Sequence, residues 1–319
     1  MLTFFTTAKP FMGHNGIIQR NALKSWKLLH PEIEVILFGS DAGSEQVCHE
    51  LGLRYEPDVE RSPLGTVRAD SLFSRAQEIA RHDLLCYVNC DIVLTREFCK
   101  ALELVHDWGH PFLMIGRRWD TALSESLDFF APDWEAKIVK RAKTGGIQRF
   151  YNNIDYFAFP RGLYREMPPL VVGRTWWDHW MVWKALDLKC GVVDASDVIC
   201  AVHQNHDYSH VPEGWRTVSG DEDARRNFEL AKGYSHQRTI EDATFRLTCA
   251  GIQSNPFHWL APTKRRVRGV RARLRSFVRT ALWHPLLSVS RPIRHAIGLK
   301  QENVPAALRR SERRHELDQ

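Results

Sequence analysis

The sequence predicts an α/β protein in which a doubly wound, mostly parallel sheet is flanked by helices. Short apolar runs alternate along the chain with amphipathic stretches of about 8 to 16 residues, the pattern of strands joined by crossover helices. The clearest run, at 84–88, contains no Gly or Pro, as expected of a strand buried on both faces of a parallel sheet. With 319 residues, 44% of them hydrophobic, the chain can form one large domain and an appendage.

The first part of the chain supplies most of this sheet and its helices. Each predicted strand is a short apolar run, and each predicted helix carries apolar residues spaced three or four apart. A helix capped by Asp41 or Ser44 ends at Gly52, because these residue types favour the two ends of a helix. In chain order we predict strands over 2–7, 34–38, 53–55, 84–88 and 111–115, and further helices over 17–29, 66–81 and 95–105.

The pattern is looser in the second part of the chain. Residues 119–150 are mixed in character and contain a Gly145-Gly146 break, so we interpret them as an insertion over one end of the sheet. Apolar periodicity then returns. The elements predicted there are strands over 155–159 and 191–202 and helices over 177–186, 221–232 and 239–248.

Composition excludes several classes of protein. The seven cysteines are odd in number and nowhere spaced as CxxC, which argues against a disulfide framework and a Cys-type zinc site. No apolar run reaches the ~18 residues of a membrane-spanning helix, and the first residues lack the basic-then-apolar layout of a secretory signal. We therefore expect a cytoplasmic protein.

The strongest candidate site follows the central strand. Asn89 and Asp91 lie two residues apart, so an extended backbone points both side chains the same way. A carboxylate between two apolar runs is costly to bury unless it is paired or holds a metal, and ligands of open α/β sheets collect at the carboxyl ends of strands. One interpretation is that Asp91 binds a divalent cation carrying a diphosphate. The alternative is a turn or capping Asp, and this stretch alone favours neither.

A second candidate lies in a cluster of tryptophans. Asp178 falls where a helix should begin, next to Trp177 and near two further indoles. A carboxylate there can act as a general base toward an acceptor hydroxyl, while indole rings stack on sugar rings. An N-cap Asp with the tryptophans in the core explains the same spacing and is favoured in isolation. A separate metal-type carboxylate at Asp91 strengthens the functional interpretation.

Histidines follow the apolar run at 198–202. His203, at the tip of that strand, is a candidate cation ligand, whereas a structural or surface role is favoured for His206 and His210. The three could instead bind zinc, but the HExxH pattern is absent.

Four other polar residues lie near the predicted strand ends. Arg68 and Asp70, ahead of the central strand, are candidates to bind a phosphate and a base or ribose, with a solvated helix face as the alternative. Asn153 and Asp155 precede a strand expected beside the cation and are candidates for contacts to sugar hydroxyls. Loop capping is the alternative.

The ordered motifs YVNCDIVL, DYFAFPRGLY, GRTWWDHW and VVDASDVICAVHQNHDYSH resemble those of nucleotide-sugar glycosyltransferases of the GT-A type, over roughly residues 1–260. The resemblance implies the GT-A (Rossmann-like) fold, a nucleotide-sugar donor, with a UDP-sugar expected, and Mn²⁺ or Mg²⁺ held by Asp91 and His203. Asn89 replaces the first Asp of the family's Asp-x-Asp motif, so Asp91 is left as the carboxylate of that motif.

The same resemblance assigns roles to the other candidates. Asp178 matches the acceptor-side base of inverting members. The cation neutralises charge developing on the leaving nucleoside diphosphate, while a carboxylate on the opposite face of the sugar activates the nucleophile. We expect donor contacts from Thr6, Arg68, Asp70, Asn89, Asp91, Asn153 and Asp155, and acceptor contacts from Trp177 and His206.

Other functions stay open on these residues. A retaining transferase is the alternative if Asp178 only caps a helix, and a non-catalytic, sugar-binding membrane scaffold is the alternative from another class. A sugar-1-phosphate nucleotidyltransferase would carry a Gly-rich, basic loop after its first strand, which TTAKPFMGHNG does not supply.

The basic charge belongs to the end of the chain. From Lys264 onward there are 15 Lys and Arg against 4 Asp and Glu, a net +11, which leaves −5 for residues 1–263 because the whole chain carries +6. Residues 264–283 place apolar side chains on one stripe and arginines on the other face, which suits an anionic membrane surface at about 1 kcal/mol per basic residue. A helix docked on the domain is the alternative. Nucleic acid is not expected as a partner, because no binding module accompanies the charge.

We therefore predict a glycosyltransferase domain over 1–260 and a basic helical tail over 261–319. The tail would hold the protein peripherally on the inner face of the membrane. A glycan or lipid-linked acceptor and a role in surface polysaccharide assembly are the corresponding expectations.

Overall fold

The structure is a computed structural model that describes residues 1–206, 215–267 and 270. The chain divides into two units, Met1–Trp259 and Leu260–Gln319. In the second unit, 261–267 are helical, and the amphipathic helix predicted over 264–283 lies mostly outside the described residues. Among the residues described, no helix is long and apolar enough to cross a membrane.

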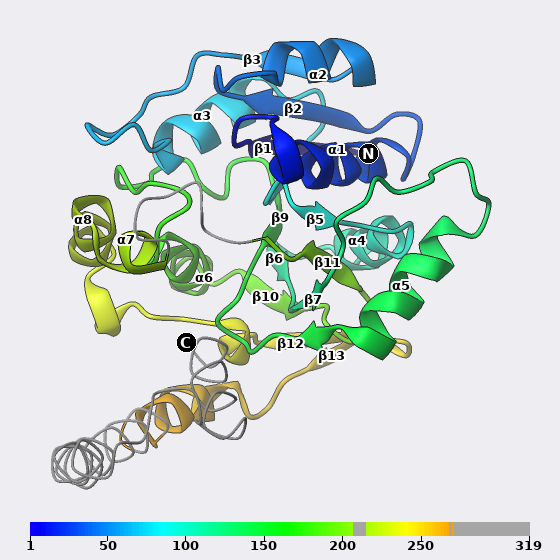
Figure 1. Cartoon of the computed structure of the whole chain (residues 1–319). Helices are drawn as coiled ribbons and strands as arrows, with labels where there is room; N and C mark the ends of the chain where they lie inside the picture. Colours follow the sequence, from blue (N-terminus) through cyan, green and yellow to red (C-terminus); the bar gives the residue numbers. More distant parts are fainter. Residues whose placement is uncertain (207–214, 268–269, 271–319) are drawn as a thin grey trace, which may run out of the picture. The chain divides into compact units, whose positions relative to one another are not determined.

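The first unit is built on a nine-stranded, mostly parallel sheet (Figure 1). From edge to edge its strands are β3 (Arg54–Glu56), β2 (Glu34–Phe38), β1 (Leu2–Thr7), β4 (Leu84–Val88), β9 (Tyr156–Pro160), β6 (Phe112–Ile115), β10 (Gly191–Asp194), β12 (Phe245–Thr248) and β13 (Gly251–Ser254). Strands β3, β2, β1 and β4 pair in parallel, as do β6, β10 and β12. Strand β9 joins the two groups and is antiparallel to both β4 and β6. The predicted α/β class with a large, mostly parallel sheet is confirmed.

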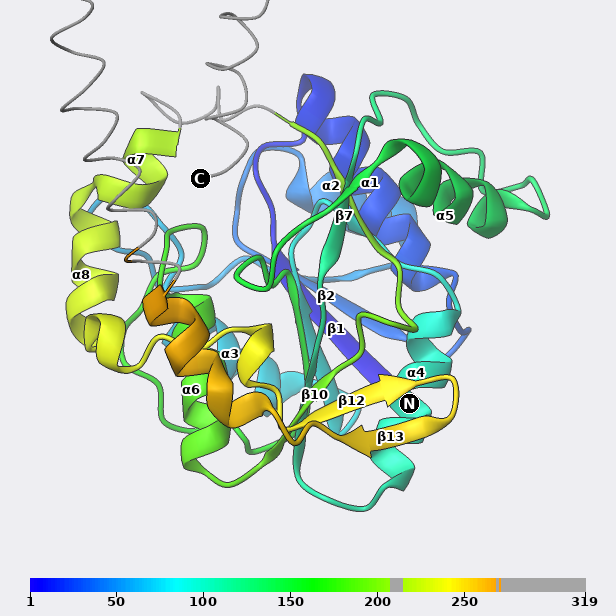
Figure 2. The same ribbon diagram turned by 90° about the horizontal axis from the view of Figure 1, so that it is seen from below.

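Helices pack on both faces of this sheet, as Figures 1 and 2 show. The described helices are α1 (Gly13–Lys27), α2 (Ser44–Leu51), α3 (Ala69–Ile79), α4 (Glu97–Asp107), α5 (Trp134–Gly145), α6 (Trp177–Asp187), α7 (Trp215–Gly220) and α8 (Glu222–Leu230), with short 3₁₀ turns η1 (Gly233–Ser235), η2 (Ile240–Asp242) and η3 (His258–Leu260). Helix α5 packs instead against a separate small sheet, with a core cluster of its own.

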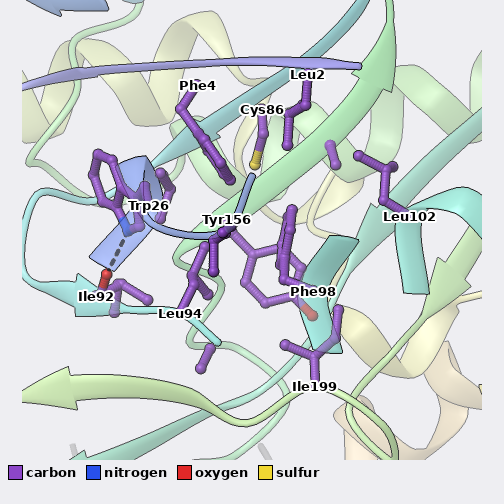
Figure 3. Packing of buried hydrophobic residues seen from close by; sticks show 14 of the residues in the cluster. Leu2, Phe4, Trp26, Cys86, Ile92, Leu94, Phe98, Leu102, Tyr156 and Ile199 are labelled. Carbon is purple, nitrogen blue, oxygen red and sulfur yellow. Dashed lines mark hydrogen bonds between the residues drawn. The ribbon is translucent and has the colours of Figure 1, made fainter. Parts of the chain in front are cut away.

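The two-residue period of β1 divides the core between the faces. Phe4 packs against Trp26 of α1 and Phe98 of α4, with ring centroids 5.6 and 5.5 Å away (Figure 3). Its neighbour Phe5 points to the other face and meets Phe73 of α3 at 4.9 Å. Because consecutive side chains of a strand alternate, β1 is buried on both sides.

A small second sheet lies beyond the carboxyl end of β4. Its strands, in order, are β5 (Ile92–Val93), β11 (Ala201–Gln204), β7 (Arg118–Thr121) and β8 (Ile147–Gln148). The indole of Trp26 donates to the carbonyl of Ile92 over 2.8 Å, which ties α1 to β5 (Figure 3). The buried side-chain Nε2 of Gln204 donates to the carbonyl of Ile18 over 2.8 Å, which ties α1 to β11 as well. These contacts fix the segment next to Asp91.

Two predictions about the second half of the chain are wrong. The helix predicted over 239–248 is the 3₁₀ turn η2 followed by β12. Thr239 and Asp242 form a capping box that closes the turn, and Phe245 then pairs with Val193 of β10. The strand predicted over 191–202 is two strands, β10 and β11, which belong to different sheets. Sheet pairing overrides local helical spacing in the first case.

Candidate metal centre

Asp91 and two histidines meet where the two sheets adjoin. The amide of Ile92 donates to the carbonyl of Asn89 over 3.1 Å, so the chain turns sharply from β4 into β5. Strand β5 pairs antiparallel with β11, which sets Ile92 opposite His203. Asp91 Oδ2 lies 3.0 Å from His206 Nε2 and 3.8 Å from His203 Nε2. The structure thus brings Asp91 and His203 together as predicted, and it adds His206, which the sequence assigns to the acceptor side.

The geometry and charge of these three residues fit a divalent cation. One ligand atom from each lies within 4.8 Å of the others. Burial opposes ionisation of Asp91, but His203 and His206 outweigh it and hold the pKa of the carboxyl well below its usual range. Its Oδ1 is buried and accepts no hydrogen bond from any described residue, which in a native protein is explained by a bound ion or water. Because Mg²⁺ prefers oxygen ligands, two imidazoles favour Mn²⁺ of the two predicted cations.

Asn89 faces a different partner from Asp91. Its Nδ2 donates to Asp155 Oδ1 over 2.7 Å, and its Oδ1 accepts from the Tyr87 hydroxyl over 3.1 Å. Arg118 Nη1 donates to the same Asp155 oxygen over 2.8 Å. The first position of the motif is therefore a hydrogen-bond donor to a buried carboxylate, which an Asp at that position is not.

We expect Asn89→Asp to lower the free energy of unfolding by about 1–3 kcal/mol, because it sets a second carboxylate against Asp155 and removes the donated hydrogen bond. Urea unfolding measures the loss. The double variant Asn89→Asp/Asp155→Asn restores one donor and one acceptor and should recover part of it, with Asp155→Asn alone as the reference. An Asn89→Asp protein as stable as the wild type would contradict this account.

Asp178 is not the N-cap of its helix. Helix α6 begins at Trp177, its N-cap position is Trp176, and no side chain caps it. Trp176 has a left-handed backbone with φ of 86°, a strained conformation for a bulky residue that is found most often at functional sites. Burial, with a contribution from the charge of Asp155, raises the pKa of Asp178 although the His179 amide favours the ionised form. The alternative of an N-cap Asp is therefore wrong.

Trp177 is a core residue. It is 4% exposed, and its ring lies 5.1 Å from that of Tyr87 and 5.3 Å from that of Phe157. It has no open ring face to offer an acceptor sugar, which corrects the predicted role. The preceding Trp176 is half-buried instead and packs edge-on against Tyr234, which is 73% exposed.

Several residues that are predicted to contact the nucleotide-sugar donor contact other protein groups instead. The Thr6 side chain is fully buried and its hydroxyl donates to the carbonyl of Thr7, so it has no surface for a donor, which corrects that assignment. Arg68 is ion-paired with Asp70, its Nε lying 3.1 Å from Oδ1, and also with Glu60. These ion pairs provide partners for both side chains at the start of α3 without a bound ligand.

The remaining two donor candidates precede β9. Asn153 lies in a turn, where its backbone N–H donates to the carbonyl of Phe150 over 3.2 Å. Asp155 is 4% exposed and is paired with Arg118. The structure therefore places Asp155 in the protein interior beside Asn89 and leaves Asn153 half-buried.

Lys9 is a site residue that the sequence analysis missed. Its Nζ lies 3.5 Å from His206 Nε2, and its charge also acts on Asp91. Gln19 of α1 holds the backbone of Lys9 at both ends, accepting from its amide over 2.6 Å and donating to its carbonyl over 2.9 Å. Because β1 and β4 are parallel neighbours, the residues after each strand lie at the same edge of the sheet, which brings Lys9, two residues beyond β1, to the same edge as Asp91.

Comparisons with known proteins concern the fold. No family model and no curated protein matches the chain. Glucosyl-3-phosphoglycerate synthase from Mycobacterium tuberculosis, solved with Mg²⁺ and UDP, is 14% identical, with 65% of this chain and 72% of that chain covered and a TM-score of 0.41. S. aureus TarS 1-349 with UDP-GlcNAc is 12% identical, with 74% and 72% covered and a TM-score of 0.42.

A third similar structure is the mannosyltransferase PcManGT from Pyrobaculum calidifontis with GDP-Man and Mn²⁺. It is 12% identical, with 72% of this chain and 64% of that chain covered and a TM-score of 0.45.

Proposed function

We propose that this chain is a metal-dependent glycosyltransferase that moves a sugar from a nucleoside-diphosphate sugar to a hydroxyl of a glycan or glycolipid acceptor. The observation that supports it is the cluster of Asp91, after β4, with His203 and His206, from the end of β11, which has the ligand types and the spacing for one divalent cation. The ends of parallel strands are where open α/β sheets bind nucleotides.

The charges around the cluster suit a diphosphate. Lys9 lies beside His206 on the side of β1, and its rigid attachment to Gln19 fixes the backbone from which its ammonium group extends. A cation at Asp91 and the ammonium of Lys9 together supply positive charge for the phosphate oxygens. When bound, the cation stabilises the negative charge that the leaving nucleoside diphosphate acquires.

The acceptor side is assigned to Asp178. Its raised pKa suits a general base, because a carboxylate destabilised by burial gains more from taking a proton than a solvated one does. A base distinct from the leaving group supports inversion of the anomeric centre, with Asp178 accepting the proton of the acceptor hydroxyl as that oxygen bonds to the sugar. The half-buried Trp176 beside it is a candidate to contact the acceptor ring.

The proposal is tested with the full chain and a panel of donors. UDP-glucose, UDP-GlcNAc and GDP-mannose are added with Mn²⁺, with Mg²⁺ or with EDTA, and the unfolding midpoint and the release of nucleoside diphosphate are measured. We expect at least one donor to raise the midpoint and to be slowly hydrolysed with Mn²⁺ but not with EDTA. A donor that binds without any turnover would favour the scaffold, and stoichiometric zinc by elemental analysis with no donor response would favour a zinc hydrolase.

We also propose that the basic tail attaches the enzyme to anionic membranes. Deleting residues 264–319 removes a net charge of +11 and should abolish co-sedimentation with vesicles that contain phosphatidylglycerol. Transfer to a soluble acceptor should persist, because the candidate site lies in Met1–Trp259. A truncated protein that still binds these vesicles, or a full chain that does not, would contradict the proposal.

A further inference from the structure

His203 lies between two carboxylates. Its Nε2 faces Asp91 Oδ2 at 3.8 Å, and its Nδ1 lies 3.2 Å from Asp120 Oδ1. The strand register produces this arrangement, since β11 sets His203 opposite Ile92 of β5 and opposite Asp120 of β7. Asp91, which directly precedes Ile92, therefore lies on one side of His203, and Asp120 lies on the other. The imidazole is 8% exposed, so water has little access to either nitrogen.

Asp120 is itself held in place. Arg118 Nε donates to Asp120 Oδ1 over 2.8 Å, and Arg149 Nε lies 3.2 Å from Asp120 Oδ2. Arg118 begins β7 and Arg149 directly follows β8, and the backbone N–H of Arg149 donates to the carbonyl of Arg118 over 2.9 Å. The side chains of Asp120 and both arginines are at most 17% exposed. A carboxylate fixed by two guanidinium groups presents a defined oxygen to the histidine.

We infer that Asp120 is a positioning residue for the metal centre. His203 Nδ1 and Asp120 Oδ1 lie 3.2 Å apart but are not aligned as a hydrogen bond in the structure. When a cation is bound, the Asp120 carboxylate would accept a hydrogen bond from His203 Nδ1–H, which would select the tautomer whose Nε2 lone pair faces the cation beside Asp91. A carboxylate behind a ligating histidine fixes the orientation of the ring and raises its basicity, and its loss costs about 10–100-fold in metal affinity. The inference rests on the proposed function, because it requires a cation at Asp91.

A purely structural role for Asp120 predicts different results. A buried ion pair whose partner is removed lowers stability but leaves metal affinity at an otherwise intact site unchanged. Asp221 provides a matched control, since it forms an ion pair with Arg174 at 2.6 Å and with a similarly low exposed fraction, away from the histidines. Asp221→Asn should weaken the fold without affecting the metal centre.

The test measures Mn²⁺ binding to the full chain by electron paramagnetic resonance. We expect Asp120→Asn to raise the dissociation constant for Mn²⁺ about 10–100-fold, Asp120→Glu to recover part of the affinity, and Asp221→Asn to bind as the wild type does. A wild type that binds no Mn²⁺ would overturn the proposed function itself. A wild type that binds, with Asp120→Asn binding equally tightly, would overturn only the role of Asp120.

A second measurement needs no folded variant at position 120. Long-range ¹⁵N–¹H spectra of the wild type loaded with diamagnetic Zn²⁺ report which nitrogen of each histidine carries a proton, and His203→Gln identifies the signals of His203. We expect the proton on Nδ1. A proton on Nε2, with Nδ1 unprotonated, would overturn the inference even if Asp120→Asn fails to fold.

Discussion

Replacing Asp91 with Asn should reduce metal-dependent turnover of the donor by about a thousandfold or more. The amide has no charge and is a weak ligand, so the cation loses its only carboxylate among the described ligands of the cluster. A loss of several kcal/mol of charge stabilisation in the transition state corresponds to that factor, at about 1.4 kcal/mol for each tenfold change. Release of nucleoside diphosphate at saturating donor and Mn²⁺ measures the effect.

Stability measurements separate the metal role of Asp91 from its ion pairs. Mn²⁺ should raise the unfolding midpoint of the wild type and leave that of Asp91→Asn unchanged, because only a protein that binds the ion gains from it. In EDTA the variant should be less stable at neutral pH. The pKa of Asp91 is lowered by folding, so its contribution is present above the unfolded value and is lost as the pH falls through the folded one. Equal stabilisation of both proteins by Mn²⁺ would place the ion elsewhere.

The sequence predicts Asp91 and His203 because each directly follows an apolar run. Such a signal is local, and it requires only that strands end at a common edge. The place of His206 depends instead on the end of β11, where the backbone N–H of its last residue, Gln204, donates to the Asp91 carbonyl over 3.2 Å. That contact joins residues 113 positions apart, so no local pattern indicates it.

The buried network around Asp155 was beyond prediction for a related reason. The strand over 155–159 is found nearly as predicted, but its direction is not encoded in its apolar pattern. Because β9 runs antiparallel to β4, Asp155, just before β9, lies beside Asn89, just after β4. The backbone N–H of Asn89 donates to the backbone carbonyl of Asp155 over 2.9 Å. A parallel strand would have carried Asp155 to the opposite edge of the sheet.

The tryptophan cluster shows the limit of residue type as a guide to function. Trp176 and Trp177 are adjacent and chemically identical, yet only Trp177 is in the core. The left-handed backbone at Trp176 sets which ring turns inward. That conformation is rare outside glycine, so sequence patterns do not predict it.

Asp178→Asn should abolish sugar transfer and at the same time stabilise the protein at neutral pH. Transfer should fall by about 10²–10⁴-fold, the usual contribution of a general base, while donor binding with Mn²⁺ persists because Asp178 lies outside the metal cluster. Folding raises the pKa of Asp178, so ionising this carboxyl costs more in the folded protein than in the unfolded chain. A neutral amide of the same shape avoids that cost.

The pH dependence of stability determines whether Asp178→Asn stabilises or destabilises the protein. A group whose pKa is raised by folding favours the folded state below its unfolded pKa, and this advantage is lost as the pH rises through the folded value. The stability gained by Asp178→Asn should therefore grow as the pH rises through the raised, folded value and should vanish below the ordinary carboxyl value of 3.8. Asp187→Asn, at the exposed end of the same helix, is the matched control and should change neither transfer nor stability appreciably. If Asp178 served the helix instead, its replacement would lower the unfolding midpoint at pH 8 and leave transfer at the wild-type rate.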